Sequence, residues 1–253
     1  MYFSSNTGIR MALAIVAMAL FTTTAQAGTL LTLDFEFEDD GTTPLFNGQQ
    51  IDDEFGTHVD ISSVGVGSKH LGPAIYDTTP GVNSADPDLV FNQGNVLILQ
   101  NTTNPATTGD FFDTPNDTNK GGLLILDFVQ DVALVDMLFA DQDEGATVTI
   151  FDDQCLTREW ILPKDWTNDG GKLTLDFAAG DQPGQNSNDA TFTGDSGFNL
   201  SAVDRLEIDF NGSGGIDDVR FEVNDNAVVP TPPAMLAGAG LLAFAVRRRK
   251  VRR

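Results

Sequence analysis

The feature that most constrains the fold is a series of short apolar or alternating segments, separated by turns rich in Gly, Asp and Asn, between residues 29 and 223. In the first segment, residues 29–37, Leu and Phe alternate with Thr, Asp and Glu, which is typical of a half-buried strand. No stretch between the chain ends carries an amphipathic helix of three turns. We therefore expect strands at residues 29–37, 55–61, 74–76, 95–100, 123–128, 132–139, 146–151, 158–162, 172–177, 203–210 and 216–223.

These segments predict an all-β protein with a single antiparallel β-sandwich, and the long loops favour a jelly-roll-like strand order over a plain meander. The three segments between residues 123 and 151 follow one another closely, so we expect them to pair as an antiparallel meander. The segments on either side of the turn at residues 168–171 should form another pair. The last two segments should close the domain as a hairpin.

The chain has 253 residues and a formal charge of −23, and this charge is unevenly distributed. All 37 acidic residues lie between Asp34 and Asp225, where seven basic residues leave a formal charge of −30. Such a surface repels nucleic acid and anionic lipid, which excludes nucleic acid as a partner. Such a negative charge is typical of a soluble secreted protein, of a protein that collects divalent cations, or of an acidic protein that stays soluble in a saline habitat. The single cysteine, Cys155, excludes an internal disulfide and a cysteine-based zinc site.

Residues 1–27 have the parts of a secretory signal peptide: the positive charge of Arg10, a short apolar run, and the small residues Ala25 and Ala27 at the cleavage site. We expect signal peptidase to remove this helical segment, so that Gly28 begins the mature chain. The alternative is a retained membrane anchor, which the short apolar run disfavours.

The C-terminal residues form a Pro-rich box, an apolar stretch and a cluster of Arg and Lys, in that order. An apolar stretch ended by clustered Arg and Lys stops in a membrane with its charges on the cytoplasmic side. The expected organisation is a signal peptide at 1–27, a β-sandwich domain at 28–226, a sorting box or linker at 227–233, a single transmembrane helix at 234–246 and a basic cytoplasmic tail at 247–253.

This tail resembles the PEP-CTERM sorting signal of bacterial surface proteins, in which a Val-Pro-Glu-Pro-like box precedes a short apolar helix and an Arg cluster. The matching residues are Val229, Pro230, Thr231, Pro232, Arg247, Arg248 and Arg249, with Thr231 where Glu is commonest in the family. The resemblance implies an exosortase-type sorting enzyme as a partner and a transient intermediate in the inner membrane of a Gram-negative bacterium. It also implies delivery to the cell surface or the extracellular matrix. The alternative is an ordinary tail anchor with a basic stop.

Four short motifs follow one another in the middle of the chain: AIYD at 74–77, DPDL at 86–89, GNVLI at 94–98 and GGIDDV at 214–219. In this order they resemble secreted bacterial β-sandwich domains of the carbohydrate-binding-module type, over about residues 30–223. The resemblance implies a jelly-roll with adjacent first and last strands, and a structural calcium ion that bridges them. The positions that match such an ion are Glu36 or Glu38 on the first strand, and Asp217 and Asp218 on the last strand. Because Asp217 and Asp218 point to opposite faces, only one of their side chains can bind the ion, and the other residue can offer its carbonyl.

Two further acidic groups are candidates for calcium, which takes six to eight oxygen ligands, several of them carboxylates. Asp86 and Asp88 form one group. Asp141, Asp143 and Glu144 form the other, beside Gly145, which allows a tight turn. Neither group has the twelve-residue spacing of a helix-loop-helix calcium site. The alternative is that all these carboxylates are solvated turn residues.

Carbohydrate is the second candidate ligand, because sugar-binding faces stack aromatic rings on the sugar and surround them with Asp, Asn and Gln. Trp166 lies in a polar turn and is expected to be exposed, and Tyr76 is the second candidate. Trp160 falls in a strand, where core packing is expected. Phe111 and Phe112 are weaker candidates.

No catalytic centre is expected. Residues 194–197 read GDSG, as in the nucleophile turn of trypsin-like proteases, but the sequence around this turn and around His58 does not match that family. We expect an exported, non-catalytic surface or matrix protein whose β-sandwich can bind carbohydrate and calcium. The alternatives are a secreted polysaccharide-active hydrolase and a purely structural biofilm component.

Overall fold

The structure is a computed structural model, and it describes residues 28–65, 70–82, 86–102 and 106–223. It confirms the expected all-β class: within these residues there are strands and one 3₁₀ turn, Gln185–Ser187. The strands are β1 (Thr29–Leu33), β2 (Val59–Val64), β3 (His70–Asp77), β4 (Asn95–Asn101), β5 (Thr107–Thr108), β6 (Phe111–Phe112), β7 (Gly122–Ala140), β8 (Ala146–Asp152), β9 (Thr157–Leu162), β10 (Lys172–Asp176), β11 (Thr191–Gly194), β12 (Val203–Phe210) and β13 (Gly215–Val223).

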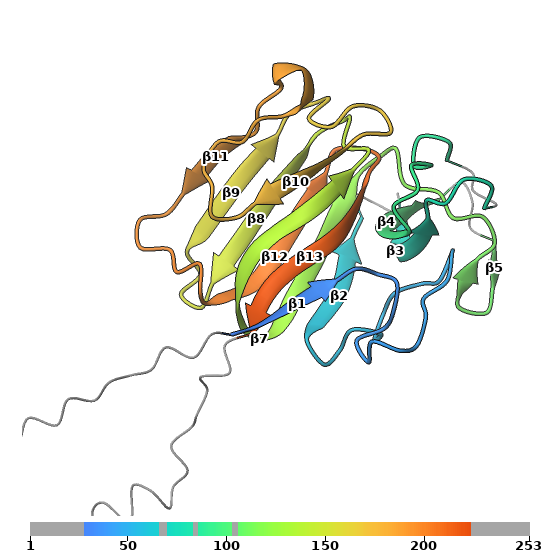
Figure 1. Cartoon of the computed structure of the whole chain (residues 1–253), viewed down its shortest axis with the longest axis horizontal. Helices are drawn as coiled ribbons and strands as arrows, with labels where there is room; N and C mark the ends of the chain where they lie inside the picture. Colours follow the sequence, from blue (N-terminus) through green and yellow to red (C-terminus); the bar gives the residue numbers. More distant parts are fainter. Residues whose placement is uncertain (1–27, 66–69, 83–85, 103–105, 224–253) are drawn as a thin grey trace, which may run out of the picture.

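Eleven of these strands belong to one hydrogen-bonded, antiparallel sheet in the described part of the chain. Its main path runs β11-β9-β8-β12-β7-β13-β4-β3, while β2 and β10 pair with β7 and β1 pairs with β13 (Figure 1). The short strands β5 and β6 form a separate hairpin.

Strand β7 folds this sheet into a β-sandwich-like arrangement because its two halves have different partners. Its first half, up to Phe128, pairs with β12 and β2, whereas its second half, from Val132, pairs mainly with β13 and β10. The residues between the halves, 129–131, are exposed. Residues in both halves alternate between buried and partly buried, so each half turns one face toward a shared core.

Three expected pairings are wrong, although the strands themselves lie near their expected positions. The segments expected as a meander do not pair with one another, since β8 pairs with β9 and β12. Strands β9 and β10 do not pair, because β9 lies between β8 and β11 while β10 joins β7. Strands β12 and β13 form no hairpin, because β7 separates them in the sheet. In each case at least one of the strands pairs instead with a strand that is distant in sequence.

Local backbone geometry shifts some strand ends. Strand β1 stops at Leu33 rather than residue 37, because Phe35 has φ +53°, a left-handed conformation that ends an extended strand. Strand β2 begins at Val59 because the preceding residues form a turn in which the Val59 N–H donates to the Phe55 carbonyl. The short hairpin β5–β6 interrupts the loop expected at residues 101–122.

The core is rich in aromatic rings. Trp160 is fully buried on β9 and packs against Phe177 and Phe192, with ring centroids 5.5 and 5.2 Å apart. Phe139 on β7 makes edge contacts with Trp166 and Phe210. These contacts join residues from several strands and loops between residues 139 and 210, so this part of the core forms only when those elements assemble.

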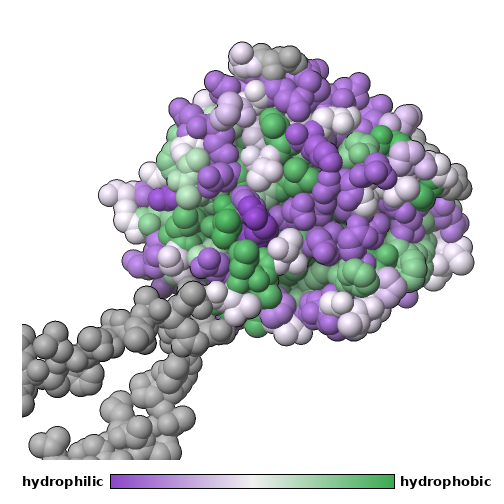
Figure 2. Space-filling view, in the orientation of Figure 1, coloured by the Kyte–Doolittle hydropathy of each residue, from purple (hydrophilic) through white to green (hydrophobic). Residues whose placement is uncertain are grey.

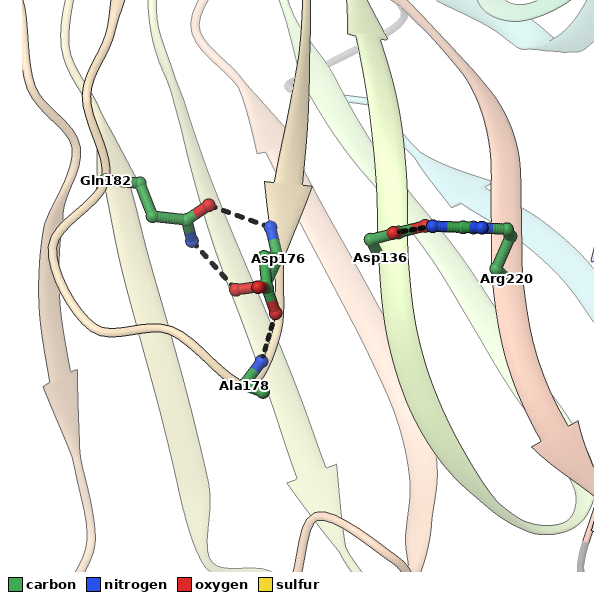
Figure 3. A network of polar contacts seen from close by, with 5 residues as sticks. All are labelled: Asp136, Asp176, Ala178, Gln182 and Arg220. Atoms are coloured by element: carbon green, nitrogen blue, oxygen red, sulfur yellow. Dashed lines mark hydrogen bonds and ion pairs between the residues drawn. The ribbon is translucent and has the colours of Figure 1, made fainter. Parts of the chain in front are cut away.

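Polar contacts hold neighbouring strands in register (Figure 3). Arg220 on β13 reaches across to Asp136 on β7 and makes a two-nitrogen contact with its carboxylate. The Gln182 side chain accepts from the Asp176 N–H and donates to the Asp176 carbonyl, both at 2.8 Å. The Asp176 carboxylate in turn accepts the Ala178 N–H, which fixes the turn that follows β10.

The two ends of the described domain lie together. Strand β1 pairs with β13 so that Thr29 faces Val223, which confirms that the first and last strands are adjacent. The first and last described residues, Gly28 and Val223, therefore lie next to each other (Figure 1). The opposite end of β13, at Gly215, lies beside the end of β7 at Ala140. We call the loops at that opposite end the distal loops; they join β3 to β4, β6 to β7, β7 to β8, β9 to β10 and β12 to β13.

Candidate metal centre

Five carboxylates gather in the distal loops. Three connections supply them: β3–β4, β6–β7 and β7–β8. We call this group the loop carboxylate cluster: Asp86, Asp88, Asp117, Asp141 and Asp143. It unites the two acidic pairs that the sequence suggested separately. It also contains Asp117, which the sequence reasoning missed because it lies in a loop rich in Asn, Thr and Pro that has no periodic signal.

Asp117 is buried, with 5% of its surface exposed. One carboxylate oxygen accepts the Gly214 N–H from the β12–β13 loop. Burial raises its pKa well above the ordinary value, and a hydrogen-bond contact with the Asp86 carboxyl group raises it further. Two carboxylates in such contact repel each other, so one of the groups holds a proton unless a cation lies between them.

Tyr76 on β3 helps to hold the loop that carries Asp86, because its hydroxyl donates to the Asp86 carbonyl. Its ring is fully buried, and burial raises the pKa of the phenol, with the Asp86 charge as the next cause.

The Asp141 carboxylate accepts the Gly170 N–H at 2.7 Å, which ties the β7–β8 loop to the β9–β10 loop. Burial nevertheless raises its pKa to about 7, and the charge of Asp143 adds to the effect. The pKa of Asp143 is raised to about 6, first by its hydrogen-bond contact with Glu144 and then by burial. The pKa of Asp88 is raised by burial and by neighbouring carboxylates. The negative charges of these carboxylates are therefore poorly compensated by the surrounding protein.

Gln142 is the second feature of this region that sequence reasoning missed. It is fully buried, yet neither its amide oxygen nor its amide nitrogen has a hydrogen-bond partner in the described structure. A Cβ placed on Gly214 would lie 3.0 Å from the Gln142 Oε1 atom and 3.4 Å from the Asp141 carbonyl oxygen. The same Gly214 donates its N–H to Asp117. The unpaired amide oxygen therefore lies against the glycine that contacts the cluster.

The terminal-strand residues, expected first for calcium, do not form one group. The Glu36 carboxylate accepts the Asn95 N–H at 2.7 Å. The pKa of Glu38 is raised, first by burial and then by the nearby charges of Asp40 and Glu54. This divergence follows from the bend at Phe35, which ends the alternation of the strand.

Asp217 and Asp218 lie near Asp34 rather than near Glu38. Asp217 is 2% exposed, and burial raises its pKa to about 8, with the Asp218 charge as the next cause. Burial and Asp34 raise the pKa of Asp218, while Arg220 opposes this shift. In the described structure, no three of Glu36, Glu38, Asp217 and Asp218 bring possible ligand atoms within 4.8 Å of one another.

Within the described ranges, one group of three or more His, Cys, Asp or Glu has its possible ligand atoms within 4.8 Å of one another: Asp52, Asp53 and Glu54. Its carboxylates accept hydrogen bonds from their own turn, since one Glu54 oxygen accepts the N–H groups of Asp52 and Asp53. The two Asp side chains are exposed. We interpret this group as a self-capped turn.

The expectation that Trp166 is exposed is wrong. Its indole is fully buried and packs edge-on against Phe139, with 5.7 Å between ring centroids. Tyr76 is equally buried, so neither ring offers a face to a sugar. Phe111 is 36% exposed and lines a pocket of about 310 Å³ together with Gln49, Gln50, Asp52, Asp53, Glu54 and Asp110.

The signal-cleavage residues Ala25 and Ala27 lie outside the described residues, as do the sorting residues from Val229 to Arg249. Among the helices of the described part, none is long and apolar enough to cross a membrane. No known protein-family model matches the chain, and no curated protein matches it.

Proposed function

We propose that this chain is an exported, non-catalytic protein of a Gram-negative bacterial surface or extracellular matrix. Its end is sorted by a PEP-CTERM-like signal, and its jelly-roll-like sandwich is stabilised by calcium. The observation that carries the proposal is the pairing of Thr29 with Val223, which brings both chain exits to one end of the domain.

This arrangement suits a domain that is held by one end and binds with the other. Strand β13 runs nine residues from the distal loops to Val223, a length of roughly 27 Å at the usual rise of a strand. The distal loops would then face away from a membrane or matrix attachment at the C-terminal side (Figure 1). The visible face of the domain mixes hydrophilic and hydrophobic residues in small patches, which is compatible with an aqueous exterior (Figure 2).

Export is tested by placing an epitope tag at Gly41, whose turn is exposed and open, and expressing the full chain in a host with an exosortase-type enzyme. We expect antibody labelling of intact cells and a mature chain shortened at both ends. Replacement of Arg247, Arg248 and Arg249 by Ala should leave signal cleavage intact and abolish surface labelling. An untrimmed, cytosolic chain would refute the proposal.

Carbohydrate recognition is best supported at the Phe111 pocket. An exposed aromatic face beside the amides and carboxylates of residues 49–54 supplies the stacking and hydrogen bonding that a neutral sugar requires. We expect Phe111→Ala to remove a glycan-array signal. Phe46→Ala serves as the control, since Phe46 is 56% exposed and does not line that pocket.

The alternatives differ in simple assays. A secreted polysaccharide-active hydrolase would release reducing sugars from a polymer, and loss of one carboxylate would stop this release. A purely structural matrix component would bind no glycan with or without chelator. In the Phe111 pocket, the Glu54 carboxylate already accepts hydrogen bonds from the Asp52 N–H and from the Gln49 side chain, which favours a binding role over a hydrolytic one.

A further inference from the structure

We propose that the distal loops form a calcium site in which the carboxylates of Asp86 and Asp117 and the amide oxygen of Gln142 are direct ligands. Asp141, Asp143 and Asp88 surround this site and act through water or as charge. The inference rests on the structural calcium of the proposed function and gives that ion a place other than the terminal strands.

The carboxyl groups of Asp86 and Asp117 are in contact, and Asp117 is buried. The Gly214 N–H supplies one hydrogen bond to the Asp117 carboxylate. The charged side chains that act most strongly on Asp117 and Asp141 are all carboxylates. Lys164 acts on Asp143 at the edge of the cluster. A divalent cation between Asp86 and Asp117 would convert this repulsion into attraction.

Gln142 supports the site independently of charge. It is fully buried, and among the described residues neither of its amide atoms has a hydrogen-bond partner, which is an unfavourable state for a buried amide. Its oxygen lies beside Gly214, the residue whose N–H binds Asp117. Glycine is required here, because φ is +139° and a Cβ would occupy the space next to the Gln142 oxygen. A cation in this region would give that oxygen the partner it lacks.

The ligand set identifies the kind of ion. All the candidate atoms are oxygens, from carboxylates, an amide and nearby backbone carbonyls, which is the set that calcium prefers. Magnesium requires near-ideal octahedral geometry, whereas calcium accepts six to eight irregular ligands. In the described structure the carboxylates of the cluster do not all lie within 4.8 Å of one another. We therefore assign direct coordination to two of them and assign the remaining positions to Gln142, carbonyls and water.

The test compares the purified full chain in calcium, in magnesium and in EGTA. Calorimetric titration should show one calcium ion per chain, and calcium should raise the thermal midpoint by several degrees, since an ion that binds only the folded state stabilises it. Asp117→Asn should weaken calcium binding at least tenfold and remove the thermal shift. In EGTA the same variant should be at least as stable as the wild type, because it removes a buried ionisable group that lies against another carboxyl group.

Asp86→Asn and Gln142→Leu provide two further variants if Asp117→Asn does not fold, and both should weaken calcium binding. Asp52→Asn is the matched control in the exposed acidic turn and should leave the calcium response unchanged.

The outcomes separate the two levels of the proposal. No calcium binding by the wild type would overturn both this site and the calcium of the proposed function. Binding that survives Asp117→Asn but is lost with Asp52→Asn or Asp217→Asn would overturn only the location. An equal thermal shift with magnesium would overturn the assignment to calcium. Export and glycan binding are measured separately and do not depend on any of these results.

Discussion

Asp217 provides a sharp test of the buried charge in this fold. The side chain is 2% exposed on β13, and one of its oxygens accepts the Asp218 N–H at 2.7 Å. Burial raises its pKa from 3.8 to about 8. Between these two values the folded state holds a proton that the unfolded state has lost. The free energy of unfolding must therefore fall as the pH rises through this window.

The magnitude follows from linkage. Each pH unit within the window removes about 1.4 kcal/mol, and saturation near the folded pKa reduces the total loss from pH 5 to pH 8 to about 3.6 kcal/mol. The change Asp217→Asn keeps an oxygen that can accept the Asp218 N–H and removes the titration. The variant should therefore gain about 3.6 kcal/mol relative to the wild type across this range, on top of a constant offset from the buried amide.

The assay is urea unfolding at pH 5, 6, 7 and 8 in EGTA, followed by tryptophan fluorescence, with a two-state fit at each pH. Asp60→Asn is the control, because it removes one negative charge from an exposed position on β2 and reports the general effect of net charge. The reasoning is refuted if the Asp217→Asn and wild-type stability curves run parallel over this range.

Two further predictions concern packing and backbone geometry. Trp160→Phe should lower the free energy of unfolding, measured with urea, by about 2 kcal/mol, because it leaves a cavity and removes the hydrogen bond of the indole nitrogen. Ile161→Val changes a half-exposed neighbour and should lower it by under about 0.5 kcal/mol. Equal effects of the two changes would contradict the burial of Trp160 in the core. Gly48→Ala should cost several times more than Gly41→Ala in the same assay, since both glycines have positive φ but only a Cβ at Gly48 would lie 2.3 Å from the Phe112 carbonyl oxygen. Similar losses at the two glycines would show that this close approach does not matter.

Much of the fold class could be read from local patterns. The segment at residues 203–210 alternates and is bounded by turns, and the structure has β12 at these positions. The segment at 95–100 is apolar from Val96 to Leu99, and β4 is buried along its whole length. Alternation reflects the two-residue period of a half-buried strand, and a short apolar run between turns reflects a strand that is buried on both faces; each segment carries its pattern in its own sequence.

The partners of the strands could not be read in the same way. Sequence neighbours were expected to pair around β8 and β10, but β7 takes β10 and β13 as partners over its second half. Pairing energy comes from cross-strand contacts and shared burial, and a segment does not encode which distant segment will supply them.

The candidate site shows the same division. Asp86 and Asp141 stood out in the sequence as turn carboxylates, and an acidic turn alone is equally suited to contact with water. Only the assembled distal loops place Asp117 against Asp86 and bury Gln142 without a partner. The sequence by itself determined the strand-forming segments and the strong negative charge of the domain. The tertiary structure decided which of those charges lie close together, because only packing removes them from water and brings residues from distant loops into contact.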